Sequence, residues 1–318
     1  MRWLDEGSPA AIAEALRQVA PALGDDPIVV RGSAGEDDPL WWSGSAVVGE
    51  RFVAKFAWSR PAALRLAYEI AVLEALTRKP AIPFLPDVVA SSTDPLLLVT
   101  RLVPGKALFD VVASLDRNDV GRQLAHFMAE LNHPATRERV ESVVGELPPV
   151  SLQPVATDAV RAGFGKWVRP DQRAAVMRWC DWADEVLATP HPSVLVHGDL
   201  HGGNQVWDGG DLRVVLDFET TGLADAEYDL RTFPGTGPGI ELLTATMRHY
   251  RQITGRELAA ERVMAWHLRT ALSDALWRSE AGVPLPDHRT PSAWVEDLAK
   301  RFAALSIDPA KSASLPPS

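Results

Sequence analysis

The fold is decided by the stretch from His197 to Glu219, which reads HGDLHGGNQVWDGGDLRVVLDFE. A Gly-Gly pair in its middle separates two apolar or alternating runs, which is the pattern of two antiparallel strands joined by a tight turn. If these glycines form the loop, Asn204 faces Val215 across the hairpin. Asp217 then lies diagonally from Asn204, on the same face.

The side chains of Asn204 and Asp217 are spaced for a shared cation, because diagonal neighbours in a hairpin lie about 7 to 8 Å apart. Oxygen atoms of an amide and a carboxylate can converge on Mg²⁺, whose bonds to oxygen are about 2.0 to 2.1 Å long. Just upstream, the buried run LVHGD is expected to end at Asp199 and expose its carboxylate. A proton acceptor beside a two-ligand metal site is what phosphoryl transfer requires, since that reaction is mostly positioning and charge neutralisation.

The rest of the chain divides into a strand-rich part and a helical part. Before Gly105 the patterns predict two helices, over 10–19 and 60–77, and strands within 27–34, 40–49, 50–58 and 95–105. After Gly105 most segments have helical spacing, and only 194–219 has strand signals. We therefore expect an α+β, two-lobed, protein-kinase-like architecture: a small β-rich N-terminal lobe over 1–105, with a hinge near 100–105, and a large mainly helical lobe over 106–318. The tail, 308–318, is expected to be flexible.

Composition narrows the function classes. The chain has 318 residues, 46% hydrophobic content and a formal net charge of −10, so a folded protein that repels nucleic acid and attracts cationic small molecules is expected. The single cysteine, Cys180, excludes an intramolecular disulfide and a cysteine-built metal cage. No apolar run has the length of a signal peptide or a membrane span. These features predict a cytoplasmic monomer or homodimer that does not bind membranes.

The motif HxDxxxxN followed by a strand that ends in DFx resembles the catalytic and metal loops of protein-kinase-like enzymes. In the form HGDLHGGN with LDFE it is similar to the aminoglycoside phosphotransferase family of small-molecule kinases. The resemblance implies ATP and Mg²⁺ as cofactors, Asp199 as the catalytic base and His197 as a support for its loop. It also implies Asn204 and Asp217 as the Mg²⁺ ligands. Asp229 in ADAEYDL matches a family segment, usually GDPxxDL, whose aspartate braces the catalytic loop.

The same resemblance extends upstream to a lysine and a glutamate. Kinases of this kind hold the α- and β-phosphates with a strand lysine, which is itself held by a glutamate of the next helix. Lys55 in FVAKF and Glu69 in AYEIAVLEAL match these positions. Glu74 is the competing glutamate, but it lies nearer the far end of the helix.

The nucleotide-binding elements between these motifs match less uniformly. The segment TRLVPG, 100–105, resembles the hinge at which backbone groups from Arg101 to Val103 meet adenine. Between the first two strands the chain reads RGSAGEDDPLWW and lacks GxGxxG. Ser33 and Gly35 are nevertheless expected to offer backbone amides to phosphate oxygens.

The acceptor side is defined by fewer signals. His201 is expected to be part of the loop scaffold rather than a metal ligand. Glu219, Asp274 and Glu280 are candidates for binding ammonium groups, because antibiotic kinases of the resembling family gather acidic side chains around their substrates. The expected reaction moves the γ-phosphate of ATP to a hydroxyl of a small cationic molecule. A metabolic kinase for an amino sugar, a sugar, choline or homoserine remains an alternative.

Two alternatives come from other classes. The sequence Asp199-Leu-His201-Gly also looks like the opening DxHG of metal-dependent phosphoesterases. Those enzymes need two metals and a GNH motif, whereas here Asn204 is followed by Gln205. A non-catalytic pseudokinase is the second alternative, but all five chemical positions are filled, so the sequence gives no sign of degeneration.

Overall fold

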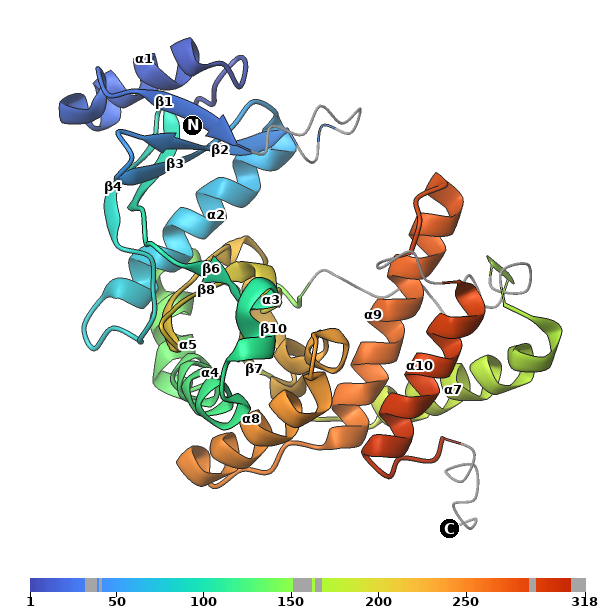
Figure 1. The fold of residues 1–318 in the computed structure, drawn as a ribbon. Coiled ribbons are helices and arrows are strands. Elements are labelled where there is room, and N and C mark those ends of the chain that lie inside the picture. The colour runs from blue at the N-terminus through green and yellow to red at the C-terminus, as the bar shows by residue number, and fades with distance from the viewer. Residues whose placement is uncertain (32–38, 40–41, 151–161, 164–167, 286–289, 310–318) are drawn as a thin grey trace.

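The computed structural model describes residues 1–31, 39, 42–150, 162–163, 168–285 and 290–309. Two lobes are visible in Figure 1: a five-stranded antiparallel sheet with its helices, and a larger, mainly helical part. The strand order in the sheet is β1-β2-β3-β5-β4. This arrangement confirms the α+β, two-lobed fold class that the sequence predicts.

The N-terminal lobe is built from five strands and two helices. The strands are β1 (Ile28–Arg31), β2 (Ser43–Val48), β3 (Phe52–Ala57), β4 (Val88–Thr93) and β5 (Leu96–Arg101). The helices are α1 (Pro9–Val19) and α2 (Arg60–Thr77), and α2 has the predicted bounds. Strand β4 was not predicted, because its sequence VVASST is half polar and its burial alternates between intermediate and exposed.

Among the described residues, the C-terminal part contains most of the helices and five short strands, which form a two-stranded and a three-stranded sheet. Its helices are α3 (Leu108–Val111), α4 (Arg117–Leu131), α5 (Pro134–Val144), α7 (Pro170–Ala188), α8 (Gly239–Thr254), α9 (Ala260–Ala281) and α10 (Pro291–Ala304). Its strands are β6 (Lys106–Ala107), β7 (Val194–Val196), β8 (Gln205–Asp208), β9 (Asp211–Val215) and β10 (Gly222–Ala224). Helix α5 was not predicted, and it follows α4 after a turn that ends at a proline.

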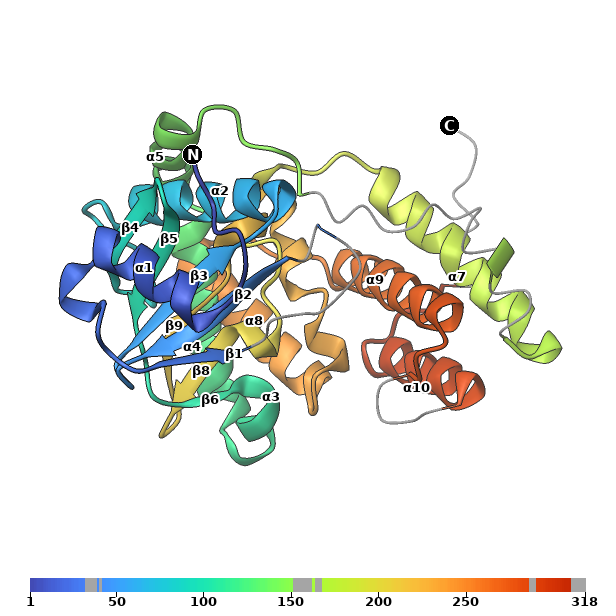
Figure 2. The same ribbon diagram turned by 90° about the horizontal axis from the view of Figure 1, so that it is seen from above.

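Strand β5 shows how the N-terminal sheet is covered on both faces. Side chains alternate along a strand, and Leu97 and Val99 belong to the core that contains α1, whereas Leu96 and Leu98 belong to the core that contains α2. The two helices therefore pack on opposite faces, as Figure 2 shows. Because α2 shares its core with the C-terminal helices, the lobes are joined by apolar packing.

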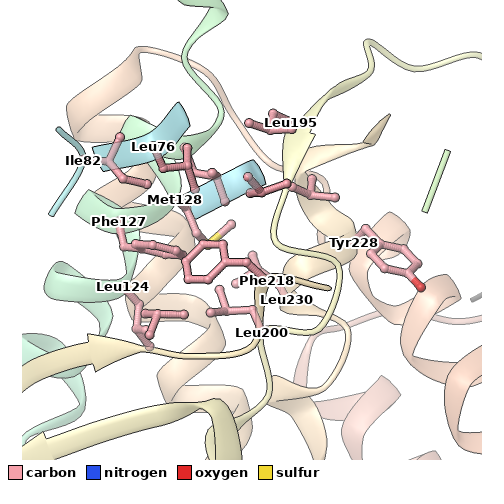
Figure 3. Close-up of a cluster of buried hydrophobic side chains, with 14 of the residues drawn as sticks. Leu76, Ile82, Leu124, Phe127, Met128, Leu195, Leu200, Phe218, Tyr228 and Leu230 are labelled. Carbon is pink, nitrogen blue, oxygen red and sulfur yellow. The ribbon is translucent and has the colours of Figure 1, made fainter. Parts of the chain in front are cut away.

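The central core surrounds the segments that carry the predicted site. Phe127 of α4 and Phe218 lie edge to face with ring centroids 6.4 Å apart, and Leu200 of the catalytic loop lies in the same cluster (Figure 3). Each of these side chains is fully buried. Burying a large apolar side chain contributes about 1.5 to 3 kcal/mol, so the loop is anchored from beneath by its own apolar residues.

A separate core holds α7, α9 and α10 together, on the right in Figure 1. It includes the buried thiol of Cys180 together with leucines of α9 and α10. Within the described part of the chain, no helix is both long and apolar enough to cross a bilayer. The described C-terminal part therefore has two hydrophobic cores, and the short helical segment Ala226–Leu230 lies next to α9.

The predicted register of the β8–β9 hairpin is wrong by one residue at its open end. The turn pairs Asp208 with Asp211 as expected, but a bulge displaces the ladder, and Val215 pairs with Gln205 rather than Asn204. The extra residue is Arg213, which lies between the pairs Trp207–Leu212 and Val206–Val214. A bulge adds a residue to one strand and cannot be read from the turn glycines alone.

One hydrogen-bonded chain ties two helices to the strand that leads into the site. The hydroxyl of Tyr250 in α8 donates to Oδ1 of Asn132 at 2.9 Å, and Nδ2 of Asn132 donates to the carbonyl of Leu195 in β7 at 2.7 Å. Both side chains are buried. Removing the hydrogen-bond partner of a buried polar group lowers the free energy of unfolding, because the group that remains is unsatisfied.

We predict that Tyr250→Phe lowers the free energy of unfolding by about 1 to 2 kcal/mol, because the Asn132 oxygen loses its donor while remaining buried. The measurement is the urea midpoint. In an Asn132→Ala background the same substitution should cost clearly less. An unchanged midpoint for Tyr250→Phe alone would contradict this role of the hydroxyl.

Candidate active site

The catalytic loop leaves the buried strand β7 at His197 and is held by one carboxylate. Asp229, fully buried, accepts the amide protons of His197 at 2.8 Å and of Gly198 at 2.9 Å. Gly198 has φ +85°, and a Cβ there would lie 2.3 Å from the carbonyl oxygen of Thr220. Only glycine fits this close approach, so the aspartate and the glycine together set the path of the loop.

The imidazole of His197 connects the predicted base to the next motif. Its Nε2 lies 2.9 Å from the carbonyl oxygen of Leu216 and its Nδ1 accepts the amide proton of Asp199 at 3.2 Å. A carbonyl can only accept, so the ring proton is on Nε2. Burial lowers the pKa of His197 and keeps it neutral. The residue therefore supports the loop by a fixed pair of hydrogen bonds.

Asp199 is partly exposed, with 29% of its side chain accessible, and several donors surround it. Oδ2 lies 3.2 Å from Nδ2 of Asn204 and 3.4 Å from Nε2 of His201, and Oδ1 lies 3.6 Å from Nη2 of Arg231. Burial alone would raise the pKa of Asp199, but the hydrogen bond from His201 and the charge of Arg231 hold it below its usual value. The carboxylate is therefore ionised and able to accept a proton near neutral pH.

Sequence reasoning missed Arg231, which is 2% exposed and lies beneath the base. Its Nη2 donates to the carbonyl of Gly198 at 2.8 Å and its Nη1 to the carbonyl of Tyr228 at 3.1 Å. The guanidinium carbon lies 4.0 Å from the centroid of the Tyr228 ring. The sequence signal that could have identified it is its position two residues after Asp229, in the run Asp229-Leu230-Arg231.

Lys55, Glu69 and Asp217 form one charge cluster that joins the lobes. Nζ of Lys55 in β3 lies 2.7 Å from Oε2 and 2.9 Å from Oε1 of Glu69 in α2. The same nitrogen lies 2.8 Å from Oδ1 of Asp217. Burial would lower the pKa of Lys55, but the two carboxylates more than offset this and raise the pKa above its ordinary value. The ammonium is therefore permanently charged.

Asp217 reaches this cluster because the chain leaves the strand at that point. Leu216 lies opposite Asn204, and the Leu216 amide donates to the Asn204 carbonyl at 2.8 Å. In a regular strand the next side chain, that of Asp217, would therefore point to the face opposite Asn204. Asp217 instead has φ +71° and ψ +66° and precedes the short helical turn Phe218–Thr220. Left-handed backbone is uncommon for residues other than glycine and often marks functional sites. The turn brings Asp217 and Asn204 to one cavity.

That cavity has a volume of about 270 Å³ and lies between the lobes. Apolar side chains from both sides face it, including Val53 and Leu98 from the sheet and Val206 and Leu216 from the hairpin region. Its polar lining comprises Ser45, Lys55, Glu69, Thr100, Arg101, Asn204 and Asp217. An apolar slot with charges at one end suits a molecule with a flat ring and an anionic tail.

The oxygen atoms near Asp217 also suit a hard divalent cation. Carboxylate oxygens of Glu69, Asp217 and Glu219 lie within 4.8 Å of one another. The amide nitrogen of Asn204 is directed at Asp199. Its other branch, Oδ1, is then available as a ligand. Mg²⁺ is bound through one or two carboxylates together with substrate phosphates, so the donor set fits.

Other predicted site residues are not brought to this cavity. Asp274 pairs with Arg278 one helical turn away at 2.8 Å, and Glu280 is exposed near the end of α9. Glu219 lies beside the cluster and 3.4 Å from Arg65 of α2. Ser33 and Gly35 lie outside the described residues. Acceptor-binding roles for Glu219, Asp274 and Glu280 stay predictions.

Comparison with known proteins agrees with this geometry. The sequence profile described as "Phosphotransferase enzyme family" matches residues 29–282. The chain is 31% identical over 258 residues to viomycin phosphotransferase of Streptomyces vinaceus, and the match covers 74% of this chain and 84% of that protein.

Solved structures of low sequence identity have the same fold. The GDP complex of wild-type aminoglycoside 2′-phosphotransferase-IIIa is similar with a TM-score of 0.68 and 19% identity, covering 93% of this chain and 99% of that one. The apoenzyme of a macrolide 2′-phosphotransferase from Brachybacterium faecium has a TM-score of 0.59 and 20% identity, covering 93% and 97%. A spectinomycin phosphotransferase bound to ADP and spectinomycin has a TM-score of 0.61 and 12% identity, covering 94% of each chain.

A buried histidine of α9, His267, links Arg231 to Arg301 of α10. Nδ1 of His267 lies 2.7 Å from the carbonyl oxygen of Arg231, and Nε2 lies 2.8 Å from Nη1 of Arg301. The arginine can only donate, so Nε2 is an acceptor and the ring is neutral. Burial, together with the charge of Arg301, lowers the pKa of His267 to about 3.

We predict an acid-sensitive contribution to stability from His267. The pKa of His267 is about 3 in the folded protein and 6.5 for an ordinary histidine. Between pH 3 and pH 6.5, His267 therefore binds a proton more readily in the unfolded chain than in the folded protein. Stability from this group is complete above about pH 6.5 and falls as pH decreases towards 3, by about 2 kcal/mol at pH 5. Urea midpoints at pH 7 and pH 5 measure this difference, which His267→Gln should reduce and His249→Gln, at a half-buried position on α8, should not. Equal pH dependence in His267→Gln and the unmodified protein would contradict it.

Proposed function

The chain belongs to the phosphotransferase enzyme family, and within it we propose that the protein transfers the γ-phosphate of ATP to a hydroxyl of a cationic antibiotic. The observation that carries the proposal is the convergence of Lys55, Asn204 and Asp217 on one cavity, with Asp199 hydrogen-bonded to Asn204 at its edge. Its similarity to viomycin phosphotransferase supports an antibiotic as the acceptor. The net charge of −10 favours a cationic one.

The lining of the cavity supports a role for different residues in binding each part of the nucleotide. The base fits between Val53 and Leu98 above and Val206 below, since these apolar side chains line the slot. The amides of Arg101 and Leu102 already donate to Asp87 and Arg51 carbonyls. Val103, whose amide has no partner among the described residues, is therefore the hinge position left to meet the base.

The charged end of the cavity receives the phosphates. Lys55 exchanges its contact with Asp217 for phosphate oxygens while Glu69 keeps it in place, because Glu69 holds the ammonium through both of its oxygens. Asn204 and Asp217 would hold Mg²⁺, which would neutralise negative charge on the phosphates. Glu219 lies close enough to Asp217 to add negative charge to this site.

Asp199 orients the acceptor hydroxyl and accepts its proton. The hydroxyl oxygen forms a bond to the γ-phosphorus while the bond from that phosphorus to the β-phosphate oxygen breaks, and ADP leaves. The proton passes to the carboxylate of Asp199, which is ionised because its pKa is held low by His201 and Arg231 against the effect of burial. Positioning of this kind, rather than covalent chemistry by the protein, supplies most of the rate enhancement in such reactions.

The direct test is an ATP-consumption assay on purified protein with viomycin, kanamycin, spectinomycin, choline and homoserine as separate acceptors. Consumption that depends on an antibiotic, together with a product heavier by one phosphoryl group, would support the proposal. Transfer only to choline or homoserine would replace the acceptor class with a metabolic one. Hydrolysis of simple phosphate esters without ATP-dependent transfer would contradict the phosphotransferase mechanism assigned to the site.

We predict that Asp199→Asn lowers kcat at least about a hundredfold, the low end expected for removal of a general base, while ADP affinity changes little. Steady-state assays and calorimetric titration with ADP give the two quantities. Asp211→Asn, an exposed carboxylate in the β8–β9 turn, is the matched control and should behave like the unmodified enzyme. Near-normal turnover in Asp199→Asn would remove Asp199 from the mechanism.

A second substitution tests the metal site. We predict that Asp217→Ala raises the Mg²⁺ concentration needed for half-maximal ADP binding by at least about tenfold, because loss of groups around a metal commonly weakens its binding by 10- to 100-fold. Titrating ADP binding against Mg²⁺ measures this without relying on turnover. An identical Mg²⁺ response in the variant would show that Asp217 does not hold the ion.

A further inference from the structure

His201 is fixed in the catalytic loop by an aromatic partner from a different element. Phe109 of α3 stacks on its imidazole with ring centroids 5.9 Å apart and planes 7° from parallel. A Cβ at Gly202 would lie 2.9 Å from Phe109, and one at Gly203 would lie 2.7 Å from His201. The two glycines therefore leave room for the stacked pair against the loop.

The hydrogen bonds of His201 also fix where its proton lies. The amide of Gly203 lies 2.9 Å from Nδ1. An amide nitrogen can only donate, so Nδ1 is an acceptor and the proton of the neutral ring is on Nε2. That N–H lies 3.4 Å from Oδ2 of Asp199. The Gly203 amide thus fixes the tautomer in which His201 directs a donor, and not an acceptor, at the carboxylate of Asp199.

The two oxygens of Asp199 are consequently different. Oδ2 faces two donors, Nε2 of His201 and Nδ2 of Asn204. Among the described residues, the polar contact given for Oδ1 is Nη2 of Arg231, at 3.6 Å, beyond an ordinary hydrogen bond. Rotation of the Asp199 carboxylate about χ2 has only a low barrier. Hydrogen-bond donors to Oδ2 therefore limit this rotation and thereby fix the direction of Oδ1.

We propose that His201, held flat by Phe109, is a positioning residue that fixes the carboxylate of Asp199 and leaves Oδ1 to accept the proton of the substrate hydroxyl. The proposal rests on the assignment of Asp199 as the base. It gives a role to Phe109, a large apolar side chain that is 52% exposed beside the catalytic loop.

Two replacements separate this role from simple support of the loop. His201→Gln can place an amide N–H near the position of Nε2 but loses the acceptor for Gly203. His201→Asn keeps an oxygen near the position of Nδ1, for the Gly203 amide, but is too short to reach Asp199. Positioning predicts that the Gln variant retains most of kcat and that the Asn variant loses about 10- to 100-fold, the range for one hydrogen bond to a charged group. KM for ATP should stay the same in both.

The opposite order, with Asn active and Gln impaired, would overturn the proposal in favour of loop support. Equal turnover in the two variants, whether high or low, would also overturn it. Thermal unfolding of each variant identifies any loss that comes from misfolding. If only the Asn variant is destabilised, its kcat is measured at a temperature where both variants are folded, and a persisting gap supports positioning.

Phe109→Leu tests the stacked partner, because leucine keeps apolar bulk without a flat face. It should lower kcat by about three- to tenfold with little change in KM for ATP, since it loosens His201 without removing the donor. Ile253→Ala, a similarly exposed apolar side chain on α8, is the control on a distant surface. Equal kcat in Phe109→Leu and the control would exclude the stack from the mechanism.

A double-mutant cycle shows whether His201 acts through Asp199. In an Asp199→Asn background, His201→Asn should have little further effect on kcat, because contacting residues with one shared function are non-additive. Additive losses would contradict action through the base. If Asp199→Asn is itself fully active, the proposed function fails; if it is inactive while every His201 variant is active, only the present inference fails.

Discussion

The arrangement of the whole site depends on the contact of the Lys55 ammonium with Glu69 and Asp217. The lysine comes from the sheet, Glu69 from α2 and Asp217 from the end of the hairpin, so this contact forms only when both lobes are packed together. A buried charge that loses its partner is strongly destabilising. The charges therefore favour the packed arrangement, and hydrogen bonding from Tyr68 of α2 to the carbonyl of Thr221 adds to it.

The base loop is organised by groups that never touch a substrate. Asp229 fixes two amides of the loop, His197 links the loop to the chain before Asp217, and Arg231 holds the carbonyl of Gly198. These supports are buried and hydrogen-bonded to backbone. Catalytic groups held in this way need little rearrangement during the reaction. The rigidity of the loop thus comes from the core, while Asp199, partly exposed, contacts the cavity-lining Asn204.

Much of this could be predicted from sequence because local patterns carry it. The bounds of α2 and the strand position of Lys55 follow from apolar periodicity and the proline in the first turn of the helix. The bulge at Arg213 and the left-handed turn at Asp217 could not be predicted, since both depend on how the hairpin packs. Arg231 and Phe109 were missed for the same reason: their roles arise from tertiary contacts between segments far apart in the chain.

The acceptor side is where sequence reasoning was weakest. Asp274 and Glu280 on α9 were predicted to bind ammonium groups of the acceptor, but Asp274 pairs with Arg278, and Asp225 nearby pairs with Arg262. Such pairs stabilise helix packing and leave little free charge for a ligand. Attraction of a cation would then come from the overall charge of the protein. Specificity for the acceptor would then come from the shape of its binding site.

We propose that the acceptor hydroxyl attacks the γ-phosphorus directly, with Asp199 as proton acceptor and no covalent intermediate on the protein. The most direct measurement is the stereochemical course at phosphorus, with ATP made chiral at the γ-position by oxygen isotopes and the accepted antibiotic as acceptor. A single in-line displacement predicts inversion of configuration in the product. Retention would mean that the phosphoryl group passes through a residue of the enzyme, and would contradict the account.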